Sequence, residues 1–216
     1  MPRTSKKYYP KSSKSTSDSG RAFDSLFNSS KYSDVTIYLG KSKIPFPAHR
    51  LVLGTRCPYL DDILQSGLKE DITTEISFTK DNSHALWRVL QYIYTGDYSD
   101  EPSETLDSED DDLELLKHPR IFALSGIFRI DDLKELSCNK FEDQLEQHWI
   151  SDTFPHCIRE IYSTSNNTDI RKIVVDAVAS HSQDLVEKRS FQDLIREVGD
   201  FAVDLVLKMA EGSGRY

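Results

Sequence analysis

The sequence predicts an α+β unit with a small three-stranded sheet packed with helices, followed by an all-helical C-terminal extension. Two observations lead to this fold class. Three short strand-like segments, 34–39, 44–47 and 75–78, alternate with helical patterns in the first part of the chain. From residue 154 onward, apolar residues recur only at helical spacing. Few strands followed by helices alone are typical of an α+β domain with a helical addition.

Length and composition exclude several classes of protein. The chain has 216 residues and a net charge of −9, and no apolar run approaches the ~18 residues that a membrane span needs. The N-terminus has no apolar stretch, so we expect no secretory signal. The cysteines, Cys57, Cys138 and Cys157, are too scattered for a disulfide framework. We therefore expect a reducing compartment, the cytoplasm and/or the nucleus.

The charge is concentrated in two segments. Residues 1–31 carry seven basic and two acidic residues, and within them 1–20 form a Ser/Lys-rich leader that we expect to be disordered. Residues 97–114 carry ten acidic residues and no basic one. Both segments are interpreted as solvated. The alternatives are nucleic-acid binding by the leader, against which its diluted lysines argue, and loose Ca²⁺ binding by the acidic loop, which lacks the spacing of a tight site.

The first half of the chain alternates short strands with short helices. Phe23, Leu26 and Phe27 fall on one face of a short amphipathic helix. The segment 34–39 alternates apolar and polar residues, which indicates a strand with one buried face. The other elements predicted in this half are a turn at 40–43, an edge strand at 44–47, a helix over 49–53 closed by Gly54, a helix from Pro58 to Leu64, a strand at 75–78, and a helix over 86–93 that Asp81 or Asn82 can cap and Thr95-Gly96 ends.

Helical periodicity continues beyond the acidic loop. An apolar helical pattern extends from Leu113 to Phe128, with Pro119 as a break or restart within it. Asp131 can cap a following helix over 133–145. Further helical stripes span 154–161, 170–185, 191–198 and 201–209, and Asn166-Asn167 and Gly199 separate them.

No set of residues predicts an enzyme, a metal site or a cofactor site. His49 and Cys57 are separated by a helix turn and a loop, so nothing favours nucleophile–base geometry, and Cys57 is expected to fill the core. The six histidines are dispersed, and the sequence contains neither a Cys-x-x-Cys pair nor a Gly-rich phosphate loop. We therefore expect a non-enzyme without cofactor, metal or small-molecule substrate.

Two charges occur where an apolar core would not place them. Asp34 opens an apolar strand, and Arg50 begins an apolar helix. One interpretation is hydrogen bonding at the strand start and helix cap. The other is a partly buried charge pair at a subunit interface, where each charge would compensate the other.

The ordered motifs around these residues resemble the BTB/POZ domain. They cover about 22–145, and beyond them 154–209 resembles the short BACK-like helical tail of stand-alone fungal BTB proteins. The motifs are Tyr32-Ser-Asp-Val-Thr-Ile-Tyr-Leu39, Phe46-Pro-Ala-His-Arg-Leu-Val-Leu53, Cys57-Pro-Tyr-Leu60, Tyr92-Ile-Tyr-Thr-Gly96, Ile121-Phe-Ala-Leu124 and Asp132-Leu-Lys-Glu-Leu136. The resemblance divides the chain into a leader at 1–20, a BTB/POZ domain at 21–147 with an acidic insertion at 97–112, and a helical extension at 148–211.

The resemblance implies a protein-interaction module that homodimerises. Many members of the family are substrate adaptors of a cullin-class ubiquitin ligase, and others act in transcription regulators. Phe23, Leu26 and Phe27 match the family's N-terminal dimer helix, and Asp34 and Arg50 match paired charges near the dimer interface.

The resemblance also places candidate cullin contacts at three positions. Leu68 and Glu70 match a hydrophobic-x-Glu motif, although a plain solvated loop explains this pattern equally well, and Tyr94 lies in the Tyr-x-Tyr-Thr-Gly motif. The acidic insertion, Pro119 and Gly126 depart from the family pattern close to the expected cullin surface. Without a kelch, MATH or zinc-finger segment, the helical extension would have to select the client. The alternative function is a nuclear transcription-regulatory protein that uses the BTB domain for self-association.

Overall fold

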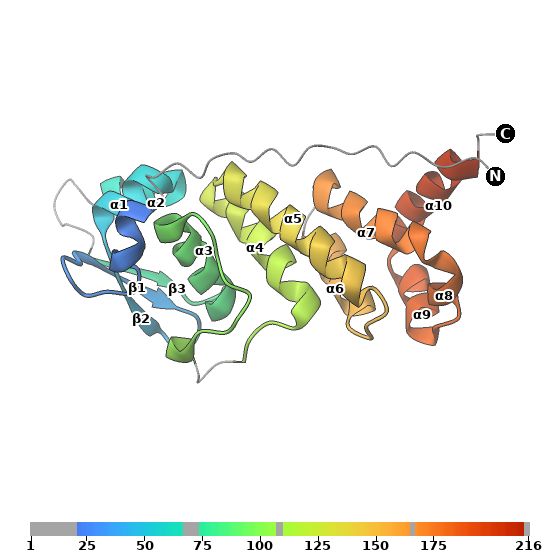
Figure 1. Ribbon diagram of the computed structural model, residues 1–216, viewed down its shortest axis with the longest axis horizontal. Coiled ribbons are helices and arrows are strands. Elements are labelled where there is room, and N and C mark those ends of the chain that lie inside the picture. The colour runs from blue at the N-terminus through green and yellow to red at the C-terminus, as the bar shows by residue number, and fades with distance from the viewer. Residues whose placement is uncertain (1–20, 67–73, 107–109, 165–166, 214–216) are drawn as a thin grey trace.

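The computed structural model describes residues 21–66, 74–106, 110–164 and 167–213 (Figure 1). In chain order the elements are η1 (Arg21–Leu26), β1 (Val35–Leu39), β2 (Ile44–Ala48), α1 (Arg50–Arg56), α2 (Pro58–Ser66), β3 (Glu75–Phe78), α3 (Ser83–Thr95), η2 (Glu104–Leu106), η3 (Glu114–Leu116), α4 (Lys117–Phe128), α5 (Asp131–His148), α6 (Phe154–Thr164), α7 (Thr168–Ser180), α8 (Ser182–Val186), α9 (Arg189–Glu197) and α10 (Gly199–Ser213). The molecule is elongated, with the sheet and α1–α3 at one end, α4 and α5 across the middle, and α6–α10 at the other end. The predicted fold class is confirmed.

The sheet has three strands in the order β2–β1–β3. β1 pairs antiparallel with β2, where Ile37 faces Phe46, and parallel with β3, where Ile37 faces Ile76. A parallel pair needs a crossover, and α1 and α2 supply it. The alternating residues Val35, Ile37 and Leu39 are buried, which confirms the predicted one-sided strand. The proline-containing strand β2 lies at an edge, as predicted.

The helices of the first half depart from the prediction at Gly54. This glycine does not close α1, which continues to Arg56. A Cβ at position 54 would lie 2.9 Å from Oδ1 of Asp61 in α2, so the glycine permits close packing of the two helices. At α3, the side chain of Asn82 accepts a hydrogen bond from the Ala85 N–H at 2.9 Å, and Gly96 ends the helix with a φ of 81°.

The predicted restart at Pro119 agrees with the structure, because η3 ends at Leu116 and Pro119 lies in the first turn of α4, where a missing N–H costs no helical hydrogen bond. An interruption at Gly126 is wrong, because this exposed residue lies inside a continuous helix. Asp131 is the first residue of α5 rather than its cap, a position held by Ile130. The predicted stripe over 170–185 is also interrupted, because His181 separates α7 from α8.

Two hydrophobic cores meet along α4 and α5. Ile121, Leu124 and Phe128 of α4 belong to the core under the sheet. Phe122 of the same helix and Phe141 of α5 belong to the core shared with α6–α10. The second core therefore extends into residues before 148, and packing is continuous across the predicted domain boundary.

Candidate functional site

The N-terminal element predicted to form a dimer surface packs partly against its own chain. The ring centroid of Phe27 lies 5.1 Å from that of Trp87 and 5.9 Å from that of Tyr94. Phe23, Leu26 and Phe27 are all half-buried against the first core. The three side chains thus stabilise the fold of one chain while leaving part of their surface accessible.

Helix α1 contacts η1 at one end and carries an exposed apolar residue near the other. The guanidinium of Arg56 lies 5.4 Å from the ring centroid of Phe23, which places η1 against the last turn of α1. One turn earlier, Leu51 is 69% exposed. Sequence periodicity did not single out Leu51, because its neighbours Val52 and Leu53 already account for the buried face of the helix.

The paired charges Asp34 and Arg50 form hydrogen bonds at element ends. Oδ1 of Asp34 accepts a hydrogen bond from the backbone N–H of Arg50 at 2.8 Å, which satisfies a donor in the first turn of α1. Nη2 of Arg50 donates to the carbonyl oxygen of Leu64 near the end of α2, also at 2.8 Å. Both hydrogen bonds lie within one chain and are of the kind that the helix-capping interpretation predicts.

The cullin-contact prediction for Tyr94 is wrong for its side chain, which is fully buried. Its hydroxyl oxygen accepts a hydrogen bond from the His49 backbone N–H and lies 2.9 Å from His49 Nδ1. His49 Nε2 lies 2.8 Å from the carbonyl oxygen of Lys31, so Nε2 carries the donated proton and Nδ1 accepts from the tyrosine. Leu68 and Glu70 lie outside the described residues.

The described parts of the acidic loop are not simply solvated. Arg88, on α3, is only 1% exposed, and its guanidinium meets Asp111 through Nη1 and Nη2 at 2.9 and 2.8 Å. The same guanidinium donates to the carbonyl oxygens of Ser99 and Asp100 at 3.1 and 3.0 Å. Burial of Asp111 acts to raise its pKa, but the hydrogen bonds and charge of Arg88 outweigh it and lower the pKa.

Arg120 connects this loop to the helical extension. It donates to Asp112, and its Nε and Nη2 bind Glu160 of α6 at 2.6 and 2.8 Å. The Asp112 side chain is completely buried, and burial raises its pKa although Arg120 opposes the shift. We call Arg88, Asp111, Asp112, Arg120 and Glu160 the ionic clamp. A sequence signal for it existed in the lone arginine within the apolar helix α3, followed by an acidic run.

A groove of about 1040 Å³ lies between the sheet unit and the helical extension. Its floor is α4, including Ala123, Gly126 and Ile127. The β1–β2 turn and the start of α3 border one side, and α5, α6 and the start of α7 border the other. Arg120 and Glu160 of the ionic clamp lie in its wall.

The remaining polar groups do not assemble a reactive centre in the described ranges. The thiol of Cys57 donates to the carbonyl oxygen of Phe128, and burial raises its pKa to about 11. His49 is bound to Tyr94 and Lys31, away from this thiol. Among the described residues, no group of three His, Cys, Asp or Glu is placed to hold a metal ion. In the same ranges, no helix has the length and apolar character needed to cross a bilayer.

Comparisons with known proteins identify the first unit. The family model described as the BTB/POZ domain matches residues 23–145. BTB/POZ domain-containing protein 9 of Homo sapiens is 38% identical over 79 residues, which cover 35% of this chain and 13% of that protein. Kelch-like protein 5 of Homo sapiens is 24% identical over 160 residues, which cover 73% of this chain and 18% of that protein. The chain therefore matches less than a fifth of the length of these relatives.

A solved structure is similar over part of the chain. It is the BTB (Tramtrack and Bric a brac) domain of human Gigaxonin, with a TM-score of 0.42 and 16% sequence identity. The match covers 64% of this chain and 98% of that structure.

Proposed function

The chain belongs to the BTB/POZ domain family, and on that premise we propose that it is a protein-interaction module that pairs with a second copy of itself and connects a cullin-class ubiquitin ligase to a client protein. Self-association rests on one observation above all. Leu51, in the first turn of α1, exposes 69% of its surface, and leaving an apolar side chain in water is unfavourable. Pairing of two such surfaces would remove this area from water, and a stable interface buries about 1,600 Å² in total.

Charge introduced at Leu51 should abolish the dimer. We expect the wild-type chain to be dimeric at tens of micromolar by light scattering, and Leu51→Asp to be monomeric, because a buried unpaired carboxylate opposes association. Leu207→Asp is the matched control, since Leu207 is 60% exposed on α10 at the other end of the molecule. A monomeric wild type, or a dimeric Leu51→Asp, would contradict self-association through this surface.

The adaptor part of the proposal rests on the hydrophobic-x-Glu match and on the intact helix α4. Leu68 and Glu70 keep the residue types and spacing of the family motif. Pro119 and Gly126, which depart from the family pattern, lie within an uninterrupted helix, so they do not argue against docking nearby. The buried Tyr94 side chain contributes to this proposal only indirectly. Its hydroxyl accepts a hydrogen bond from the backbone N–H of His49 and so fixes the start of α1.

Reversing the charge of Glu70 should weaken cullin binding by about tenfold or more, which corresponds to about 1.4 kcal/mol. The measurement is titration of purified full-length protein with purified cullin N-terminal domains. Glu187→Arg is the control, because Glu187 is an exposed glutamate at the end of α8. Unchanged affinity of Glu70→Arg would remove this motif from the proposal, and absence of binding by the wild type would remove the ligase.

A further inference from the structure

Helix α10 is apolar on its outer side as well as on its inner side. It lies at the end of the molecule opposite the sheet (Figure 1). Phe201 anchors the inner side, because its ring centroid lies 5.5 Å from that of Tyr162 and 6.2 Å from that of Phe191. A surface helix that buries one face normally carries polar residues on the opposite face. The outer side of α10 departs from this pattern.

The exposed apolar residues of α10 form one stripe. Val203, Val206 and Leu207 are 58, 64 and 60% exposed, and Ala210 is exposed as well. They occur at i, i+3, i+4 and i+7, which places them on one face of the helix. The helix rises by about 10 Å over this span. We call Val203, Val206, Leu207 and Ala210 the α10 stripe.

The spacing of the α10 stripe indicates the shape of its partner. Apolar side chains at helical spacing pack well against a second helix, whose own side chains enter the gaps between them. The helices α7 and α9 contact α10, yet no element that the structure describes covers the stripe. A contiguous exposed apolar surface of this kind is typical of an interaction site. We therefore expect a helix to cover it.

Carboxylates border the α10 stripe along one flank. Because an α-helix turns by about 100° per residue, Asp200 and Glu211 fall on the same side of the stripe, next to Leu207. Both are exposed, and neither forms an ion pair with any residue that the structure describes. Lys208, the basic residue of α10, is bound to Asp176 of α7. It therefore does not neutralise the flank.

The acidic character remains when all the charged residues nearby are counted. The segment from α7 to α10, residues 168–213, contains nine Asp and Glu and six Lys and Arg. The six include Arg171, which lies 4.3 Å from the ring centroid of Tyr162. Asp204 of α10 accepts a hydrogen bond from the hydroxyl of the same tyrosine at 2.7 Å. Basic groups beside the apolar residues of a partner would therefore gain attraction at this end of the molecule.

A second copy of α10 is a poor match for the stripe. Two such helices packed antiparallel about a two-fold axis would bring the same flank together, with Asp200 of one beside Glu211 of the other. Like charges in that position oppose the contact. Packed parallel, each acidic flank would meet the other flank of α10, which carries no basic residue, so the carboxylates would gain no partner.

We propose that the α10 stripe binds an amphipathic helix of a partner protein that carries lysine or arginine along one flank of its apolar face. The apolar side chains of this helix cover Val203, Val206 and Leu207, and its basic flank meets Asp200 and Glu211. The inference goes beyond self-association and ligase binding. It requires neither, because α10 lies at the end of the molecule opposite α1 and the sheet.

Selection from a phage-displayed library of helical peptides tests the proposal with the full-length protein. We expect enriched peptides to combine an apolar stripe with lysine or arginine. Once synthesised, they should bind the wild type at least about tenfold more tightly than Val203→Gln/Leu207→Gln. Affinity should fall as salt is raised. Ile150→Gln/Val186→Gln is the matched control, because these apolar residues are 56 and 51% exposed outside α10.

Charge reversal tests the acidic flank separately. Asp200→Lys/Glu211→Lys should weaken binding of the same peptide at least about tenfold. This variant should instead prefer an analogue in which glutamate replaces each basic residue of the peptide. Glu142→Lys/Glu146→Lys is the matched control, since both are exposed glutamates on α5.

Four results would overturn the proposal. The first is no enrichment, or enrichment of helices with acidic flanks. The second is equal binding by the wild type and the glutamine double variant, with circular dichroism showing that the variant is folded. The third is an unchanged preference of the charge-reversed variant for basic peptides. The fourth is equal binding of a peptide with the same basic residues but a scrambled apolar stripe, which would identify a general polycation surface.

Failure of this proposal can be told apart from failure of the proposed function. Leu51→Asp and Glu70→Arg should bind the enriched peptide as tightly as the wild type, whether or not the chain dimerises or binds a cullin. Loss of peptide binding in either variant would contradict a separate site on α10. A dimer of Leu51→Asp that the glutamine double variant dissociates would assign the stripe to a second copy and overturn the proposal.

Discussion

Arg88→Met should lower the free energy of unfolding by about 3–5 kcal/mol, the usual cost of removing one partner from a buried ion pair. Methionine keeps most of the apolar length of the side chain but none of its charge. The change leaves Asp111 without its bidentate partner and the carbonyl oxygen of Ser99 without a donor, whereas Lys117 still donates to the carbonyl oxygen of Asp100. Urea-induced unfolding of both proteins measures the difference.

Two further variants show whether the loss arises from the buried charge. Arg196→Met removes an exposed arginine that pairs with Asp193 at 2.8 Å, and it should cost less than about 1 kcal/mol. Adding Asp111→Asn to Arg88→Met should recover at least about 1 kcal/mol, because it removes a largely buried carboxylate that has lost its bidentate partner and keeps only the longer ion pair with Lys117, at 3.4 Å. A loss of less than about 1 kcal/mol for Arg88→Met would mean that the clamp contributes no more than a surface pair.

The ionic clamp also shows where sequence reasoning ends. Counting ten carboxylates without a basic residue in 97–114 correctly locates a loop, but it predicts solvation. Whether a carboxylate is solvated depends on which cations lie nearby in space. Arg88 precedes Asp111 by 23 residues, and Arg120 meets Glu160 across 40. Such pairings arise only after α3, α4 and α6 have packed together.

Local patterns predicted the elements well where one physical cause dominates. The alternation of apolar and polar residues predicted the bounds of β1 to within one residue. Asn82 and Gly96 correctly predicted where α3 begins and ends. The failures occurred where tertiary contacts decide. Gly54 does not end a helix; it allows α1 to pack closely against Asp61 of α2. Phe27 could equally have faced a second copy or its own core, because the apolar pattern is the same in both cases.

The candidate sites follow the same division. The family motifs placed Asp34, Arg50 and Tyr94 in a functional region, and the structure gives each a hydrogen-bonding role within the chain. Leu51 and the groove over α4 could not be predicted, because exposure depends on what the rest of the fold covers. The groove borders residues from Lys41 to Asn167, which only the packed structure brings together.

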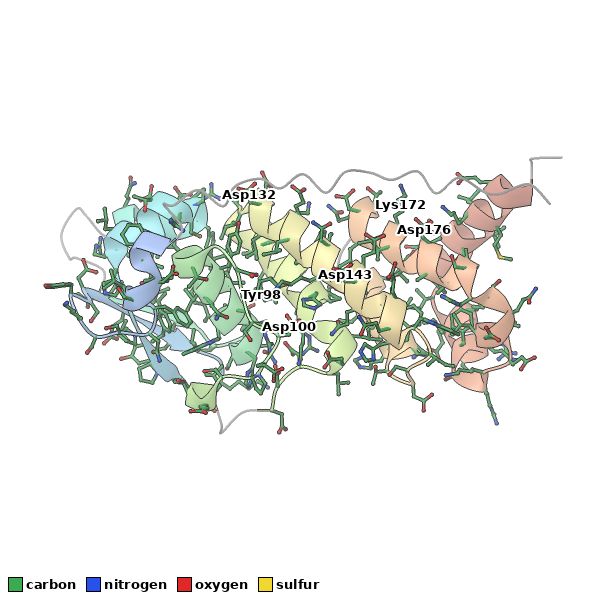
Figure 2. The ribbon with its side chains drawn as sticks, in the orientation of Figure 1. Tyr98, Asp100, Asp132, Asp143, Lys172 and Asp176 are labelled. Carbon is green, nitrogen blue, oxygen red and sulfur yellow. The ribbon has the colours of Figure 1, made fainter. Side chains whose placement is uncertain are left out.

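Lowering the pH from neutral to about 4 should destabilise the protein partly through His118. This residue is 1% exposed, and its Nδ1 lies 2.7 Å from the hydroxyl of Tyr98, which lies with Asp100 between α3 and α4 (Figure 2). Burial lowers the pKa of His118 from 6.5 to about 4, since a charged imidazolium would lose its hydration. Among the surrounding charges Asp100 and Glu114 oppose this shift, whereas Lys140 and Arg88 reinforce it.

The sign follows from proton binding by the two states. Above pH 6.5 the imidazole is neutral in both states, so it contributes no pH dependence. Between pH 6.5 and about 4 the unfolded chain binds a proton that the native protein does not, so stability falls as the pH falls, by up to about 3 kcal/mol over this window. Other groups titrate in the same range, and a matched variant is therefore needed to isolate the contribution of His118.

His118→Asn provides that comparison, because its amide oxygen can accept the hydrogen bond of Tyr98 without being able to gain a proton. At neutral pH the variant should be less stable than the wild type, since the smaller side chain leaves a cavity. Urea unfolding at successive pH values should show this gap narrowing toward pH 4, because only the wild type loses stability through His118. A gap that stays constant across the range would show that His118 takes up its proton equally in the folded and unfolded chains, contrary to the burial that the structure describes.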